Sequence, residues 1–176
     1  MTTATLLVCG LGAALTAPAA SAADAGTRGS AEARPGPMLA LTAGRLNVFD
    51  QGHSPPGGGA EYRWGSLGRW QLIPGIGFTL AEAGAAYAYA SLRRDFQLGS
   101  SWFLTPTFGA GGFRNGGDLD LGYVVEFKTG LELSFRVADR YRIGLLFYHL
   151  SNASLSDDNP GTEVLELMFG VPIGRQ

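Results

Sequence analysis

The sequence has few cysteines, few charged residues and no long apolar run beyond its N-terminal segment. Its 176 residues include one cysteine, Cys9, and only 13 lysines and arginines against 15 aspartates and glutamates. A formal net charge of −2 offers no basic surface for nucleic acid, which excludes that class of partner. Beyond the N-terminal segment, no stretch comes near the roughly 18 uninterrupted apolar residues that a membrane-spanning helix needs.

Apolar residues are nevertheless abundant, and they are distributed in short runs. Hydrophobic residues make up 45% of the chain and charged residues 16%, with 27 glycines, yet the mean hydropathy is only +0.09. An apolar exterior spread over alternating strands would explain both the apolar composition and the short runs. The length favours a single domain.

The N-terminal residues predict an export signal. Residues 6–15 are apolar and are followed by the small-residue sequence Ala20-Ser21-Ala22, which is typical of a signal-peptide cleavage site. Cys9 would leave with this segment, so the mature chain would have no cysteine for a disulfide. The predicted division is a signal peptide at 1–22, a flexible lead-in rich in Ala, Gly, Ser and Pro at 23–37, and a β-barrel at 38–176.

From Met38 onwards the chain has the pattern of strands and turns. The clearest alternation lies in 122–137, where one face is apolar and the other carries Glu126, Lys128, Glu132 and Arg136. These opposite charges are expected to pair inside a narrow barrel, since buried charges survive only when paired. The predicted strands are 38–50, 59–66, 69–80, 84–97, 101–114, 122–137, 139–152 and 162–173. The predicted fold is therefore all-β, an eight-stranded antiparallel transmembrane β-barrel.

The connections predict which end of the barrel faces out of the cell. With a periplasmic N-terminus, the external connections would be 51–58, 81–83, 115–121 and 153–161, and the periplasmic ones would lie near 67–68, 98–100 and 138. Bacterial outer-membrane barrels have short periplasmic turns and longer external loops, and most of these connections fit. Interfacial aromatic girdles are predicted from Trp64, Trp70, Trp102, Tyr87 and Tyr89. A soluble β-sandwich is the alternative fold, because its strands would also alternate.

A base, a hydroxyl and a carboxylate stand at the ends of two neighbouring apolar stripes. His149 and Ser151 end one stripe, and Glu163 begins the next. If His149 is the cross-strand partner of Glu163, then Ser151 is opposite Gly161 and the hairpin centres on Ser156, within a polar turn. Directly opposed residues have Cβ atoms roughly 4.5–5.5 Å apart, within reach of a histidine–carboxylate hydrogen bond.

These residue types suit nucleophilic catalysis. Glu163 would fix the imidazole tautomer, His149 would accept the proton of Ser151, and Ser151 Oγ would attack an ester carbonyl. Asn152 and the backbone N–H groups of 153–154 lie next to the nucleophile and would serve the developing oxyanion. A histidine and a serine two residues apart are common by chance, so a rim histidine and a loop-initiating serine are the simplest alternative.

The same residues resemble a known family. His149-Leu-Ser151-Asn152-Ala153, then a turn with Pro, Asn and Gly, then Glu163 and the closing Phe169-Gly-Val-Pro-Ile173 are similar to the lipid A 3-O-deacylases of the PagL family. The specific similarity covers roughly residues 140–173. It implies an eight-stranded outer-membrane barrel with Ser151 as nucleophile, His149 as base and Glu163 as orienting acid. Ser154 stands where the family has Gly, which keeps an N–H donor but loses glycine's backbone freedom.

The resemblance also implies a substrate and a location. It implies removal of the ester-linked 3-hydroxyacyl chain at position 3 of lipid A, in the lipopolysaccharide of the bacterial outer membrane, and it allows a homodimer. The chemistry requires no metal or organic cofactor. Asn152 and Ser154 would lie at the oxyanion or the substrate. Two functional alternatives stay open: a non-enzymatic small barrel with a structural or adhesive role, and a phospholipase or general esterase with the same triad.

Overall fold

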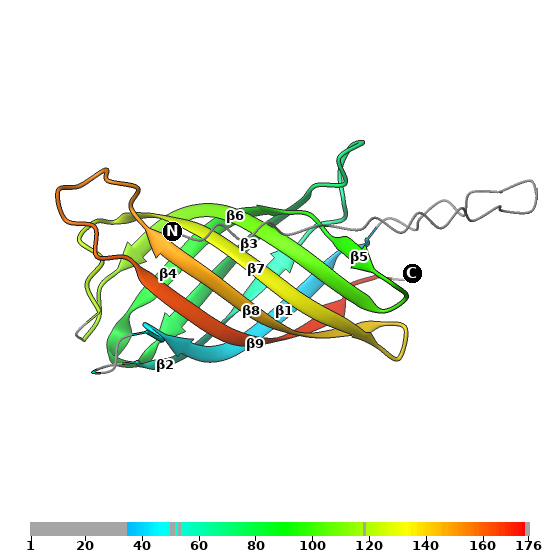
Figure 1. Ribbon diagram of the computed structural model, residues 1–176, viewed down its shortest axis with the longest axis horizontal. Helices are drawn as coiled ribbons and strands as arrows, with labels where there is room; N and C mark the ends of the chain where they lie inside the picture. The colour runs from blue at the N-terminus through cyan, green and yellow to red at the C-terminus, as the bar shows by residue number, and fades with distance from the viewer. Residues whose placement is uncertain (1–34, 50–51, 53, 118, 175–176) are drawn as a thin grey trace, which may run out of the picture. The chain divides into compact units, whose positions relative to one another are not determined.

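The computed structural model describes residues 35–49, 52, 54–117 and 119–174, which form a β-barrel (Figure 1). The predicted signal peptide and most of the predicted lead-in lie outside the described residues. The strands are β1 (Met38–Leu46), β2 (Pro56–Arg63), β3 (Ile73–Ala81), β4 (Ala86–Arg93), β5 (Phe96–Leu98), β6 (Trp102–Arg114), β7 (Val125–Val137), β8 (Tyr141–Ser151) and β9 (Thr162–Pro172), and one 3₁₀ turn, η1, spans Glu82–Gly84. No helix in the described part of the chain is long and apolar enough to cross a membrane.

Each long strand pairs antiparallel with its neighbours, and β1 pairs with β9 to close the barrel. The predicted eight-stranded antiparallel barrel is confirmed, its long strands being β1–β4 and β6–β9. We call the end where β1 begins and β9 ends the termini end. The opposite end, which carries the connection between β8 and β9, is called the site end.

Two predicted strands are shorter in the structure for identifiable reasons. The predicted strand 38–50 ends at Leu46, because Asn47 has a left-handed φ of 56°. The predicted strand 84–97 divides into β4 and β5, with the break opposite Pro106 of β6. The N–H of Arg94 still donates to the carbonyl of Pro106 at 3.3 Å, but proline has no N–H to donate in return, so the strand ladder weakens at that position.

The outer face of the barrel is apolar, as the alternation predicts, whereas the lumen holds charged side chains nearer the termini end and a buried apolar cluster, which includes Leu146, Leu150 and Val164, nearer the site end. Leu167 is 66% exposed on the outside, whereas Glu132 is fully buried inside. The apolar residues that point outward include Ile76, Phe78, Leu80, Phe108, Leu131, Leu133, Ile143, Leu145, Leu165 and Phe169. A soluble sandwich would bury such side chains, so the reversed polarity indicates a barrel surrounded by lipid.

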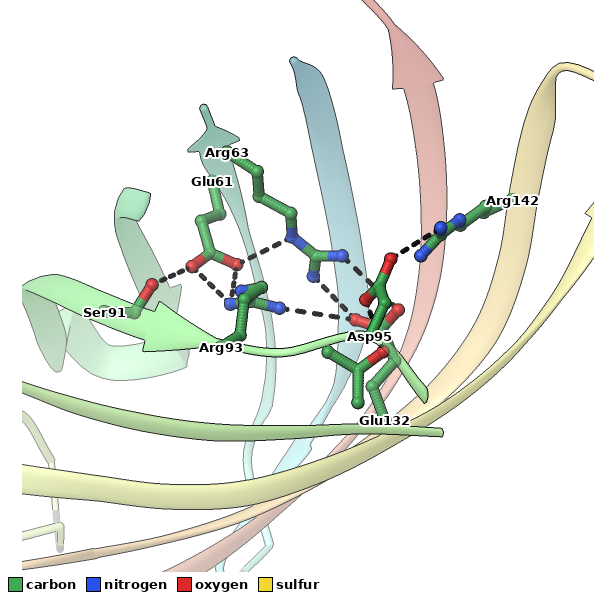
Figure 2. Close-up of polar contacts among 8 residues, drawn as sticks. Glu61, Arg63, Ser91, Arg93, Asp95, Glu132 and Arg142 are labelled. Carbon is green, nitrogen blue, oxygen red and sulfur yellow. Dashed lines mark hydrogen bonds and ion pairs between the residues drawn. The ribbon is translucent and has the colours of Figure 1, made fainter. Parts of the chain in front are cut away.

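Charged side chains fill the lumen near the termini end (Figure 2). Arg63 bonds Glu132 at 2.6 Å and Glu61 at 3.2 Å, Arg93 bonds Glu61, and all four side chains are at most 2% exposed. The predicted pairing among Glu126, Lys128, Glu132 and Arg136 is therefore wrong in its partners. The pairs of Glu132 cross the lumen from β2 and β4.

The two basic members of that predicted set, Lys128 and Arg136, meet aromatic rings. Lys128 Nζ lies 4.0 Å and 3.9 Å from the ring centroids of Tyr89 and Tyr148. The guanidinium of Arg136 lies 4.7 Å from the ring of Phe103. Cation–π contacts of this kind replace a carboxylate partner in the interior.

The aromatic girdle is only partly as predicted. Trp64, Trp70 and Trp102 are exposed, and all three lie at the termini end. Tyr87 and Tyr89 are instead buried in the lumen, where their rings stack at 5.0 Å. The tyrosine face of β4 continues with Ser91 and Arg93, which are also buried in the lumen, so these two polar residues were the signal that this face points inward.

Candidate active site

The hairpin of β8 and β9 brings His149 and Glu163 together as predicted. They are Cα partners across the two strands, and His149 Nδ1 lies 3.1 Å from Glu163 Oε1. Both side chains point to the outer face, with exposed fractions of 44% for His149 and 29% for Glu163. The pair therefore lies at the site end of the lipid-facing surface, where the apolar stripes of β8 and β9 end.

The other side of the imidazole ring lies over Gly161. A Cβ at Gly161 would lie 2.8 Å from His149 Cε1 and 3.3 Å from Nε2. The paired residues of the hairpin end at Leu150 and Thr162, and Ser151 and Gly161 are the next residues beyond this last pair. With Nδ1 directed at Glu163, the Nε2 side of the ring is thus directed toward the level of Ser151.

Ser151 lies on the same outer face as His149, one pleat closer to the barrel rim. Residues two apart on a strand have Cα atoms about 6.8 Å apart. Ser151 is half-buried and pairs with Phe127 of β7. In the part of the chain that the structure describes, the Ser151 hydroxyl makes no hydrogen bond to His149; such bonds between catalytic groups often tighten only when substrate is bound.

Asn152 faces the lumen, away from Ser151. Its side chain is fully buried, and its amide donates to the carbonyl of Asp158 at 2.7 Å and to that of Leu121 at 3.4 Å. Its backbone N–H donates to Asn159 Oδ1 at 3.0 Å. These bonds occupy its N–H donors and tie the β8–β9 connection to the β6–β7 connection. The backbone N–H groups of residues 153 and 154 are the remaining donors beside Ser151.

Ala153 and Ser154 form a tight turn directly after the candidate nucleophile. Leu155 N–H donates to the carbonyl of Asn152 at 3.0 Å, and the two central residues have φ values of 53° and 62°. Positive φ at both central positions is typical of a type I′ turn, which favours Gly or Asn. Ser154 therefore adopts the backbone conformation that glycine adopts without strain.

Two residues near the site escaped the sequence analysis. Thr129 of β7 is exposed and is the Cα partner of His149 on the side opposite Glu163. The sequence could have indicated Thr129, because it is a polar residue within the otherwise apolar outward face of β7. Phe49 follows β1, is 72% exposed, and has its ring 6.0 Å from that of Phe147. A loop aromatic gives no periodic signal, so the sequence alone does not place it here.

No three His, Cys, Asp or Glu side chains of the described residues come together as a set that could hold a metal ion. The chemistry that the arrangement offers is that of a hydroxyl, an imidazole and a carboxylate. These groups stand in order along one surface of the hairpin.

Comparison with known proteins gives three matches of different kinds. A family model described as Lipid A 3-O-deacylase (PagL) matches residues 45–172. The curated protein Lipid A deacylase PagL of Bordetella bronchiseptica is 26% identical over 121 residues, which cover 60% of this chain and 64% of that protein. The chain thus spans somewhat less than two thirds of that relative. A crystal structure of the outer membrane enzyme PagL is similar in fold, with a TM-score of 0.61 and 23% identity over 77% of this chain and 99% of that one.

Proposed function

Because the chain belongs to the lipid A 3-O-deacylase (PagL) family and is an outer-membrane β-barrel, we propose that it is a serine esterase that removes the ester-linked 3-hydroxyacyl chain at position 3 of lipid A. One observation carries the mechanistic part of this proposal. The hydrogen bond between His149 and Glu163 lies on the lipid-facing surface, with Ser151 one pleat away on the same face. Structural barrels have no need of this arrangement at a lipid boundary.

The position of the site matches the position of the bond to be broken. The ester of a membrane lipid lies between a polar headgroup and the hydrocarbon of its acyl chain. His149 and Ser151 lie where the apolar stripe of β8 meets the polar β8–β9 connection. The boundary between apolar and polar surface on the protein therefore coincides with the boundary between hydrocarbon and headgroup in the lipid. The substrate can therefore reach the site by lateral movement within its leaflet.

The proposed reaction proceeds through an acyl-enzyme. Glu163 accepts a hydrogen bond from the Nδ1–H of His149 and so keeps Nε2 unprotonated as the base. Ser151 Oγ attacks the ester carbonyl while its proton passes to Nε2, and the imidazolium then protonates the departing sugar oxygen. Water then attacks the acyl carbonyl while its proton passes to Nε2, and the imidazolium returns this proton to Ser151 Oγ as the bond to the fatty acid breaks. The backbone N–H groups of residues 153 and 154 stabilise the oxyanion in both steps.

Replacement of the three groups tests the proposal. Variants Ser151→Ala, His149→Ala and Glu163→Ala are expressed in cells, folding is checked by heat-modifiable gel migration, and lipid A is analysed by mass spectrometry. We expect the wild-type chain to remove one acyl group and Ser151→Ala to remove none. Ser156→Ala, in the same connection, is the matched control and should act like the wild type. Undiminished acyl loss with Ser151→Ala would refute the assignment of the nucleophile.

Parallel assays separate the alternatives. A non-enzymatic barrel would leave lipid A intact and would not react with a fluorophosphonate serine reagent. A phospholipase or general esterase would cleave phospholipid or nitrophenyl esters in preference to lipid A. The homodimer stays a prediction, for which crosslinking in the membrane is the measurement.

A further inference from the structure

The connection after β1 reaches the candidate site. The backbone N–H of Val48 donates to the carbonyl of Glu163 at 3.1 Å. The next residue, Phe49, places its ring 6.0 Å from that of Phe147 with a tilt of 49°, although 72% of Phe49 is exposed. A segment that leaves the barrel at β1 is thus attached to the strand of the candidate carboxylate and contacts the strand of the candidate base.

The order of the strands fixes where this ring lies. β9 stands between β1 and β8, and neighbouring strands are about 4.8 Å apart. To reach Phe147 on β8, the ring of Phe49 must cross the outer face of β9. Phe147 is the register partner of Leu165, and these two residues lie one pleat from His149 and Glu163 on the membrane side. Phe49, Phe147 and Leu165 therefore form an apolar wall beside the His149–Glu163 pair.

A second aromatic pair lies on the other side of the polar groups. Phe127, the register partner of Ser151, has its ring 6.2 Å from that of Phe108. Between the two pairs, the outer face carries Ser151, His149 and the short side chain of Thr129. An ester held at Ser151 would thus have large apolar surfaces on both sides.

We propose that Phe49 determines acyl-chain specificity, seating the hydrocarbon chain of the scissile ester against the wall that it forms with Phe147 and Leu165. This inference rests on the proposed function. A highly exposed ring contributes little to folding, because most of its surface is not buried on folding. An acyl chain is the occupant that the setting favours: the wall is apolar, faces lipid, and begins one pleat from the groups proposed to act on the ester.

Chain-length dependence of hydrolysis tests the role of Phe49. Initial rates are measured in detergent micelles with p-nitrophenyl laurate and p-nitrophenyl butyrate for the wild type, Phe49→Ala and Phe49→Trp. We expect Phe49→Ala to lower kcat/KM for the laurate roughly tenfold through a raised KM and to leave that for the butyrate nearly unchanged, as loss of one apolar contact surface does. Phe49→Trp, which restores an apolar ring, should keep the wild-type preference.

Phe78→Ala is the matched control. Phe78 is an outward-facing phenylalanine, 47% exposed, on β3, which lies opposite β8 in the ring of strands. It should keep the wild-type ratio of the two rates. A wild type without preference for the laurate, or a Phe49→Ala variant whose two rates fall equally, would overturn the inference and would indicate that Phe49 only anchors the loop at the membrane.

The two proposals fail in different ways. If Ser151→Ala retains lipid A deacylation, the proposed catalytic function fails whatever Phe49 does. If Ser151→Ala is inactive and Phe49→Ala keeps the wild-type laurate-to-butyrate ratio, only the specificity role is refuted.

Discussion

His149 and Glu163 are joined by a hydrogen bond of 3.1 Å between Nδ1 and Oε1, and they are also Cα partners across β8 and β9. The strand register itself thus sets the orientation of the imidazole. Glu163→Gln should preserve the packing but can offer an N–H to Nδ1, which favours the tautomer with the proton on Nε2. We expect kcat for lipid A deacylation to fall by roughly a factor of 10⁴, as for comparable triad substitutions.

The control for this prediction is another glutamate changed in the same way. Glu82 lies in η1, outside the hairpin, and Glu82→Gln should leave the rate unchanged. Initial rates of fatty acid release, measured on folded protein in detergent, compare the two variants. A Glu163→Gln rate within tenfold of the wild type would show that the carboxylate does not orient the base.

Gly161 offers a second test, because two separate constraints meet there. Its φ is 64°, and a Cβ would lie 2.8 Å from His149 Cε1. Gly161→Ala should cost about 1 to 2 kcal/mol of stability from the left-handed backbone and should also displace the imidazole. Gly99→Ala separates the two effects, since Gly99 has a φ of 73° with no atom within 4 Å of the added Cβ. We expect both variants to unfold at lower denaturant concentration and only Gly161→Ala to lose activity, by at least tenfold.

At Ser154 a substitution is expected to raise stability. Its φ of 62° is one that glycine adopts without strain, so Ser154→Gly should relieve strain in the turn after Ser151. Glycine also gives the unfolded chain more freedom, so the expected net gain is on the order of 0.5 to 1 kcal/mol. Amide hydrogen exchange at residues 152–156 measures this gain in the local stability of the turn. Ser156→Gly, in the same connection but without a positive φ, should reduce protection; if Ser154→Gly did so too, strain at Ser154 would be disproved.

The sequence predicts the hairpin of β8 and β9 well because the outward faces of both strands are apolar up to His149 and Glu163, and a polar turn lies between the strands. A shift of one residue would bring Arg142 of β8 or Glu166 of β9, both buried in the lumen, to the lipid-facing surface, so the register of His149 against Glu163 has few alternatives.

Tyr87 and Tyr89 were placed wrongly because the first half of β4 holds only alanine and tyrosine, and the polar residues Ser91 and Arg93 mark the inward face only in its second half. Strand periodicity alone does not determine which side of the sheet is inside.

Contacts between strands distant in sequence could not be predicted in this way. The partners of Glu132 come from β2 and β4, and their identity depends on the diameter of the closed barrel and the tilt of its strands. Phe49 is similar, because its position depends on how an irregular connection bends over β9. Alternation gives the direction of a side chain, whereas these contacts depend on the closed three-dimensional arrangement.

Asp95 gives a prediction for the pH dependence of stability. It lies in the connection between β4 and β5, outside the membrane-spanning strands, where it bonds Arg142 at 2.6 Å and accepts a hydrogen bond from Thr105 at 2.7 Å. Burial by itself raises the pKa of Asp95, but the guanidinium of Arg142 and the two hydrogen bonds outweigh it and hold the pKa below its ordinary value. A carboxyl whose pKa is lowered by folding stabilises the folded state above its unfolded pKa, about 3.9 for Asp, and loses that contribution as the pH falls through its folded pKa.

The wild-type protein should therefore lose stability more steeply than Asp95→Asn when the pH is lowered below about 4, because only the wild type binds a proton at this site on unfolding. Urea unfolding in detergent, followed by tryptophan fluorescence at a series of pH values, measures the two slopes. Asp157→Asn, in the exposed β8–β9 connection, controls for the loss of one negative charge and should keep the wild-type slope. Equal slopes for the wild type and Asp95→Asn would mean that the contacts of Asp95 with Arg142 and Thr105, which Asp157 lacks, contribute nothing to the pH dependence.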